Sequence, residues 1–157
     1  MDKRIQAVHD RKSDRIAGRL MKGIDLFEGI KGVCKGFGVE AAQFQCMGSL
    51  EHATYVQLNR NEDDTLQYSA ETVTDTPVEL LSGTGFVGLD MEGKPEVHFH
   101  GMFVDCNKNL NGGHFIDGEN PVAVTVEFVI FPLNNIRMQR GLDEIYGIPV
   151  FQFREKE

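Results

Sequence analysis

One segment near the start of the chain carries apolar residues at helical spacing. Residues three or four positions apart lie on the same face of an α-helix, so this spacing predicts a helix over 24–37. Gly36 and Gly38 mark its C-terminal end, because glycine is the usual residue where a helix stops. Gly29 and Gly32 each cost about 1 kcal/mol relative to alanine, so packing must hold this helix together. The apolar face comprises Ile24, Phe27, Ile30, Cys34 and Phe37.

Most of the remaining sequence has the pattern and the turn residues of β-strands. In the last long strand every second position from 122 to 130 is apolar, which predicts one continuous buried face. We therefore expect an α+β fold, a single domain in which one main helix packs on a curved, mostly antiparallel sheet. The expected strands are residues 15–20, 39–47, 50–58, 68–74, 78–89, 96–104, 122–131, 137–140 and 148–153.

Three histidines, His98, His100 and His114, lie within one short stretch of the chain. Because successive side chains of a strand point to opposite faces, His98 and His100 share one face, about 7 Å apart. Phe99 then points the other way, toward a core. Residues 106–113 predict a hairpin turn that folds His114 back beside the first two. Three neutral imidazoles with a fourth position open is the arrangement that zinc adopts in non-structural sites.

This interpretation depends on the hairpin register. A loop centred on Asn107 places His114 on the face of the other two histidines, whereas a two-residue turn at 107–108 places it opposite Gly101, on the wrong face. The glycines at 112–113 are expected to form a bulge that corrects such a slip. The alternative is a pair of ordinary surface or half-buried histidines and an unrelated third.

The charge balance bears on the class of partner. Across 157 residues, 24 acidic and 16 basic side chains give a formal charge of −8. DNA affinity depends largely on lysine and arginine neutralising phosphates, so an acidic domain is repelled by a duplex. The basic residues near the N-terminus alternate with Asp2, Asp10 and Asp14, which indicates a solvated surface. Charge therefore disfavours DNA as a partner.

Cysteine content and hydropathy indicate the compartment. The three cysteines are odd in number and form no C-x-x-C pair, which argues against a disulfide framework. Cys34 and Cys46 lie in apolar settings typical of a core, whereas Cys106 falls in the turn near the histidines and could approach a metal. No apolar run reaches the roughly 20 residues of a membrane span, and no signal-peptide core follows the N-terminus. We expect a cytoplasmic protein.

Two carboxylates are candidates for a catalytic role. Glu79 begins an E-L-L-S-G-T-G strand and could serve as a fourth ligand or bind the second N–H of a metal-bound histidine. The alternative for Glu79 is an exposed or ion-paired residue. Glu127 lies on the mixed face of an apolar strand, where burial would raise its pKa and suit it to act as an acid or base.

Several motifs occur in an order that identifies a family. Together they resemble the PPC (plants and prokaryotes conserved) domain, which follows AT-hooks in plant nuclear proteins and stands alone in bacteria and archaea. The resemblance covers residues 15–153, leaving 1–14 as an N-terminal extension and 154–157 as a C-terminal tail. The motifs are Gly48-Ser49-Leu50, E-L-L-S-G-T-G at 79–85, V-H-F-H at 97–100, G-G-H-F at 112–115, V-E-F-V-I at 126–130 and D-E-I-Y-G-I-P-V at 143–150.

The resemblance implies a homotrimer whose curved sheets pack around a threefold axis. It also implies a distant fold relationship to α-acetolactate decarboxylase, a zinc enzyme whose metal site is an H-x-H pair plus a third histidine. The matching positions here are His98, His100 and His114, so a divalent metal, with zinc expected, is implied at these residues. The chain has no R-G-R-P core of an AT-hook, which supplies the DNA contact in plant members.

Three functional hypotheses follow. The first is a PPC-domain homotrimer with a three-histidine divalent-metal site and a small-molecule-binding or regulatory role. The second is a DNA-binding or transcription-associated module. The third is a metal-dependent, lyase-like enzyme with Glu79 or Glu127 as the proton carrier.

Overall fold

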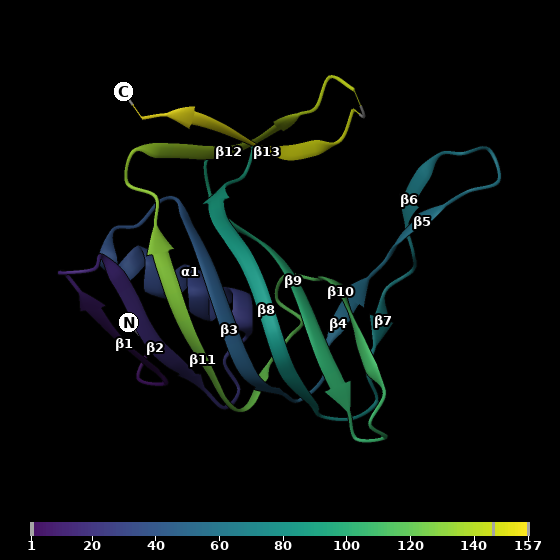
Figure 1. Cartoon of the computed structure of the whole chain (residues 1–157), viewed down its shortest axis with the longest axis horizontal. Coiled ribbons are helices and arrows are strands. Elements are labelled where there is room, and N and C mark those ends of the chain that lie inside the picture. Colours follow the sequence, from purple (N-terminus) through teal and green to yellow (C-terminus); the bar gives the residue numbers. More distant parts are fainter. Residues whose placement is uncertain (1, 146, 157) are drawn as a thin grey trace.

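The computed structural model describes residues 2–145 and 147–156 (Figure 1). Capping residues in the sequence fix both ends of its helix. Helix α1 (Leu26–Phe37) begins after Asp25, whose Oδ1 accepts hydrogen bonds from the backbone N–H groups of Phe27 and Glu28. It ends at Gly38, which has a φ of 71°. The predicted helix is thus confirmed. Among the described residues, no helix has the length and apolar content to cross a membrane.

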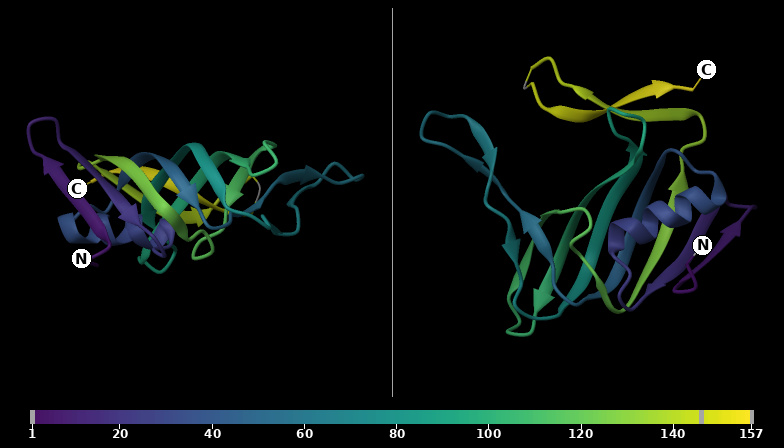
Figure 2. Two further views of the ribbon diagram at one scale, coloured as in Figure 1. Left: turned by 90° about the horizontal axis from the view of Figure 1, so that it is seen from below. Right: turned by 180° about the vertical axis from the view of Figure 1, so that it is seen from behind.

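The strands form one large antiparallel sheet in the order β1-β2-β11-β3-β8-β9-β10-β4-β7, and α1 lies across one of its faces (Figures 1 and 2). This is the predicted α+β architecture. Its strands are β1 (Ile5–Asp10), β2 (Arg15–Met21), β3 (Ala42–Leu50), β4 (Thr54–Val56), β7 (Thr72–Val73), β8 (Val78–Leu89), β9 (Pro95–Asp105), β10 (Leu110–Phe115) and β11 (Val122–Pro132).

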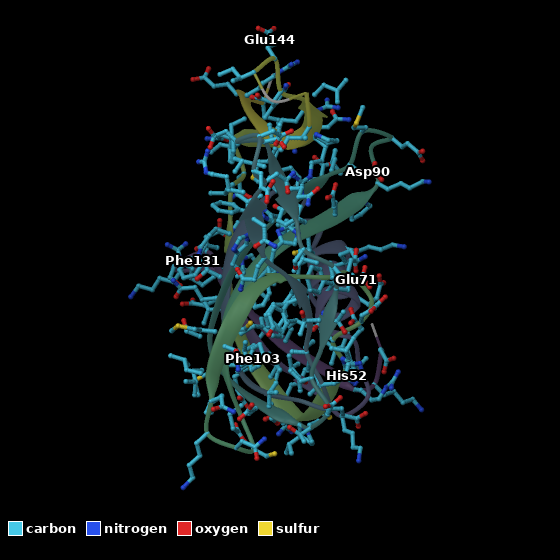
Figure 3. The ribbon with its side chains drawn as sticks, turned by 90° about the vertical axis from the view of Figure 1, so that its right-hand side faces the viewer. His52, Glu71, Asp90, Phe103, Phe131 and Glu144 are labelled. Atoms are coloured by element: carbon cyan, nitrogen blue, oxygen red, sulfur yellow. The ribbon has the colours of Figure 1, made fainter. Side chains whose placement is uncertain are left out.

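Two hairpins project from the main sheet (Figure 1). The first, β5 (Leu58–Arg60) with β6 (Leu66–Tyr68), extends from one side. The second, β12 (Ile136–Leu142) with β13 (Pro149–Glu155), lies across the end of β8 and touches it through one bridge, Gln139 to Leu89. In the side view of Figure 3, Glu144 at the tip of this second hairpin stands far from Phe103 in the body of the sheet.

The sheet extends beyond both predicted domain boundaries. Within the expected extension 1–14, residues 5–10 form β1 and pair with β2 from Ile5–Leu20 to Asp10–Arg15. At the other end β13 runs to Glu155, into the expected tail 154–157. Hydrogen bonding to a neighbouring strand therefore incorporates segments whose own sequence carries little hydrophobic pattern.

The predicted continuous apolar face of β11 is wrong at Val124. This side chain is 71% exposed, whereas Val122 and Val126 are buried. The pairing of β11 with β3 shifts register between Val122 and Val126, opposite Gly48. Gly48 has a φ of 149°, and a Cβ there would lie 2.2 Å from the backbone oxygen of Thr125. The irregularity turns Val124 out of the core.

Aromatic rings fill the core beneath the predicted site. Phe99 of β9 stacks on Phe44 at a centroid distance of 5.6 Å and meets Phe27 of α1 and Phe115 of β10 edge-on. A Cβ at Gly83 would lie 2.0 Å from the Phe99 ring, so glycine leaves room for it on the neighbouring strand. Phe99 therefore points to the helix side of the sheet, as predicted, and the histidines of β9 lie on the opposite side.

Candidate metal centre

The hairpin register places His114 directly across from His100. The connecting loop is short and fixed by Asp105, whose Oδ1 accepts the backbone N–H groups of Asn107 and Asn109. Of the two registers that the sequence left open, the structure therefore has the loop centred on Asn107 and excludes the two-residue turn. His100 and His114 therefore share one face of the sheet, and His98 lies on that face two residues along β9.

The glycines before His114 have a role other than the bulge that a slipped register would need. The β9–β10 pairing runs without a shift from Leu110 to His114, so no bulge occurs there. A Cβ at Gly112 would instead lie 2.3 Å from the backbone oxygen of Gly101, and one at Gly113 would lie 2.6 Å from that of Val56. These glycines allow β10 to approach the strands on both sides.

Replacing Gly112 by alanine is expected to disturb the site without touching a histidine. The added methyl group forces β10 away from β9, so we expect the free energy of unfolding to fall by about 2–3 kcal/mol and zinc affinity to fall about tenfold. Urea denaturation and zinc titration measure both. The matched control is Gly32→Ala in α1, where the nearest atom to a new Cβ is 3.6 Å away and a gain of about 1 kcal/mol is expected. Unchanged zinc affinity in Gly112→Ala would contradict this account.

The three imidazole rings form a nearly equilateral triangle. Their centroids are 5.0 Å apart for His98 and His100, 4.9 Å for His98 and His114, and 5.1 Å for His100 and His114. One ring nitrogen from each lies within 4.8 Å of the others, and the Nε2 atoms of His98 and His100 are 3.1 Å apart. Tetrahedral zinc with bonds of about 2.0–2.1 Å spaces its nitrogen ligands about 3.3 Å apart. The rings thus fit one small cation.

The surroundings keep these imidazoles neutral, which is the form that binds metal. Burial, followed by the charges of His114, His100 and Arg140, lowers the pKa of His98 from 6.5 to about 4. Burial is also the main cause that lowers the pKa of His100 and of His114. In addition, the Nδ1 atom of His114 is buried and has no hydrogen-bond partner among residues 2–145 and 147–156. A buried polar atom of this kind is costly unless something binds it.

Acid is expected to destabilise the metal-free protein through these rings. Between pH 6.5 and about 4 the unfolded chain protonates His98 and the folded one does not, so the unfolded state binds more protons and stability falls as the pH falls through this window. Urea denaturation of chelator-treated protein above and inside the window measures the slope. His98→Gln removes one of the three titrating rings and is expected to reduce that slope. Identical slopes for the two proteins would refute the prediction.

The two predicted catalytic carboxylates do not reach the histidines. Glu79 of β8 pairs opposite Val104, which lies four residues, or about 13 Å, from His100 along β9. Glu127 is exposed on β11, which two strands separate from β9. Cys106 is also exposed, in the turn beyond β9. In the described part of the chain, the group of potential ligands contains the three histidines alone.

Two charged residues near the site were missed by the sequence analysis. Nε of Arg140 donates to Glu96 at 2.9 Å, and the Arg140 guanidinium lies 4.3 Å from the centroid of Phe151. Alternation along β9 places Glu96 on the face of His98, so that signal was present. No local sequence pattern links Arg140 to the histidines, because it reaches the site from the β12–β13 hairpin.

Comparison with solved structures finds the same fold in several organisms. A candidate DNA-binding protein from Bacteroides thetaiotaomicron superposes with a TM-score of 0.78 at 14% identity, covering 96% of this chain and 99% of its own. A metal-containing protein from Archaeoglobus fulgidus superposes with a TM-score of 0.74 at 22% identity, covering 96% of this chain and 99% of its own. A plant- and prokaryote-conserved (PPC) protein from Pyrococcus horikoshii gives 0.73 at 21% identity, covering 97% and 96%. These TM-scores establish a shared fold.

At the level of sequence, no curated protein matches this chain. A family model, in contrast, matches residues 9–134, which include all of the strands that carry the histidines. That model describes the Plants and Prokaryotes Conserved (PCC) domain, the same family that is abbreviated PPC above. The chain belongs to the Plants and Prokaryotes Conserved domain family.

Proposed function

We propose that this protein holds a divalent metal ion, with zinc expected, at His98, His100 and His114, and that it has a small-molecule-binding or regulatory role. The observation that carries the proposal is the triangle of three neutral imidazoles, with centroid distances of 4.9–5.1 Å. The description of the Archaeoglobus fulgidus neighbour as metal-containing supports it.

The chain itself supplies neutral nitrogen ligands and a rigid support. His98 and His100 are fixed on one long strand, and His114 is held opposite by the β9–β10 pairing. Because none of these ligands carries charge, a bound ion keeps its full double charge. Zinc held by the three histidines would supply a Lewis acid at this face of the sheet.

We also propose that the protein assembles as a homotrimer, as the family resemblance implies. Large apolar side chains on the two projecting hairpins support assembly, because patches of this kind on soluble proteins usually mark interaction surfaces. These exposed residues are Leu58 and Leu66 on the β5–β6 hairpin, and Leu142 and Ile145 on the β12–β13 hairpin.

Elemental analysis and light scattering on protein purified without added metal test both parts. We expect about one divalent ion per chain and a mass of three times 17.6 kDa. Protein that carries no metal and takes up none from stoichiometric zinc would refute the metal site. A monomeric mass would refute the assembly.

A DNA-binding role is the second candidate, because the Bacteroides thetaiotaomicron neighbour is described as a candidate DNA-binding protein. The formal charge of −8 opposes it. We therefore expect no binding of a labelled duplex in fluorescence anisotropy, even at low salt. Binding that weakens steeply between two salt concentrations would instead favour the DNA-binding role.

A further inference from the structure

A hollow of about 890 Å³ opens beside two of the three histidines. We call it the histidine hollow; its walls include Tyr68, Phe86, His98, His114, Arg140 and Phe151. Its size falls within the range of small-molecule pockets, about 300–1,000 Å³. It joins the face of the main sheet to the β12–β13 hairpin, which crosses the end of that sheet in Figure 1.

Aromatic rings line the histidine hollow on two sides. The ring centroids of Phe151 on β13 and His98 are 6.4 Å apart. The Phe86 ring meets the Phe153 ring edge-on, with their centroids 6.1 Å apart. The ring centroid of Tyr68, on the β5–β6 hairpin, lies 5.2 Å from that of His114. Flat or branched apolar groups pack well against walls of this kind. The ligand that fits here therefore has an apolar body.

One positive side chain belongs to the same hollow. Arg140 is only 15% exposed, and its guanidinium is held by Glu96 at Nε, by the carbonyl of Pro149 at Nη1 and by the ring of Phe151. Its Nη2 has no hydrogen-bond partner among the residues that the structure describes. Arg140 lines the same hollow as His98 and His114, which places it beside the metal centre. A fixed guanidinium with a free donor suits a carboxylate.

The carboxylates around the hollow are already engaged. Glu96 binds Arg140, and Glu92 pairs with Lys94 at 2.6 Å. Oδ1 of Asp90, at the turn labelled in Figure 3, accepts the backbone N–H groups of Glu92 and Lys94. These contacts leave the metal centre and Nη2 of Arg140 without a partner among the described residues. Both favour an anion over a cation.

We infer that the histidine hollow binds a small carboxylate with an aromatic or branched apolar body. Arg140 and the metal at the histidines hold the carboxylate, and the body lies among Phe86, Phe151 and Phe153. The metal contact rests on the proposed function, whereas the contacts with Arg140 and the aromatic rings do not.

Calorimetric titration with three probes tests this inference. We expect zinc-loaded protein to bind 3-phenylpropanoate, to bind propanoate at least tenfold more weakly because it lacks the ring, and not to bind 3-phenylpropylamine. Arg140→Gln is expected to lower the affinity for 3-phenylpropanoate about tenfold or more and to leave the zinc content unchanged. The matched control is Arg137→Gln on the same strand, whose side chain is exposed and lies outside the histidine hollow.

The outcomes separate the ligand from the metal. Zinc-loaded protein that ignores 3-phenylpropanoate, or binds the amine as tightly, overturns the ligand inference and leaves the metal site intact. Equal binding by parent and Arg140→Gln overturns it too. Protein that takes up no zinc refutes the proposed function, and binding of 3-phenylpropanoate that still depends on Arg140 then supports the ligand inference. Phe151→Leu provides a second variant. It is expected to reduce the ratio of the affinity for 3-phenylpropanoate to the affinity for propanoate.

Discussion

Replacing His98 and His100 together by alanine is expected to abolish metal binding. The parent protein offers three neutral nitrogens within 4.8 Å of one another, and the variant retains one. Loss of partners that merely orient a ligand costs about 10–100-fold in affinity, so loss of two ligands should exceed 100-fold. Elemental analysis of both proteins, purified in parallel without added metal, measures the difference. Equal metal content in the two proteins would refute the proposed metal site.

Thermal unfolding separates metal loss from misfolding. Zinc that binds only the folded state stabilises it by about 2.7 kcal/mol at a hundred times its dissociation constant, so it should raise the melting temperature of the parent and leave that of the variant unchanged. Both proteins should melt alike after chelation. His52→Ala, which removes a histidine outside the cluster, is expected to retain the metal and the shift with zinc.

Replacing Asn120 by alanine is expected to destabilise the fold by about 3 kcal/mol. Asn120 is fully buried, accepts the backbone N–H of Thr54 at Oδ1 and donates from Nδ2 to the carbonyl of Ile116. Alanine leaves both backbone groups without a partner, and each buried unsatisfied group costs about 1–3 kcal/mol. Urea denaturation measures the change in the free energy of unfolding.

This substitution also connects the core to the metal centre. The backbone N–H of Asn120 donates to Asp25 at the start of α1, and Thr54 begins β4, which pairs with β10 at His114. We therefore expect zinc affinity to fall along with stability. Asn59→Ala, at an exposed position of β5, serves as the control and should change stability by less than about 0.5 kcal/mol. A loss below 1 kcal/mol for Asn120→Ala would refute this role.

Local sequence was sufficient to predict the helix and the two histidines of β9. The apolar spacing over 24–37 and the glycine at 38 correspond to α1 and its cap. His98 and His100 share a face because alternation is a property of any extended strand. His114 followed from the loop centred on Asn107. Each of these features depends on interactions between residues close together in the chain.

Features that depend on contacts between distant strands were beyond such reasoning. Val124 left the predicted apolar face because Gly48, on another strand, shifts the register of β11. Glu79 and Glu127 were plausible acids by composition, but the β8–β9 register sets Glu79 apart from the histidines and the strand order sets Glu127 apart. Arg140 enters the site only because the β12–β13 hairpin folds across the end of β8.

The sequence by itself determined the elements, the acidic character of the surface and the three imidazoles that could meet around one ion. Periodicity, turn chemistry and charge are local or additive properties, so they can be evaluated without knowing which strands are neighbours. The tertiary structure alone decided which charged and aromatic groups surround those imidazoles. Strand order and hairpin placement result from packing over the whole sheet, and no short stretch of sequence specifies them.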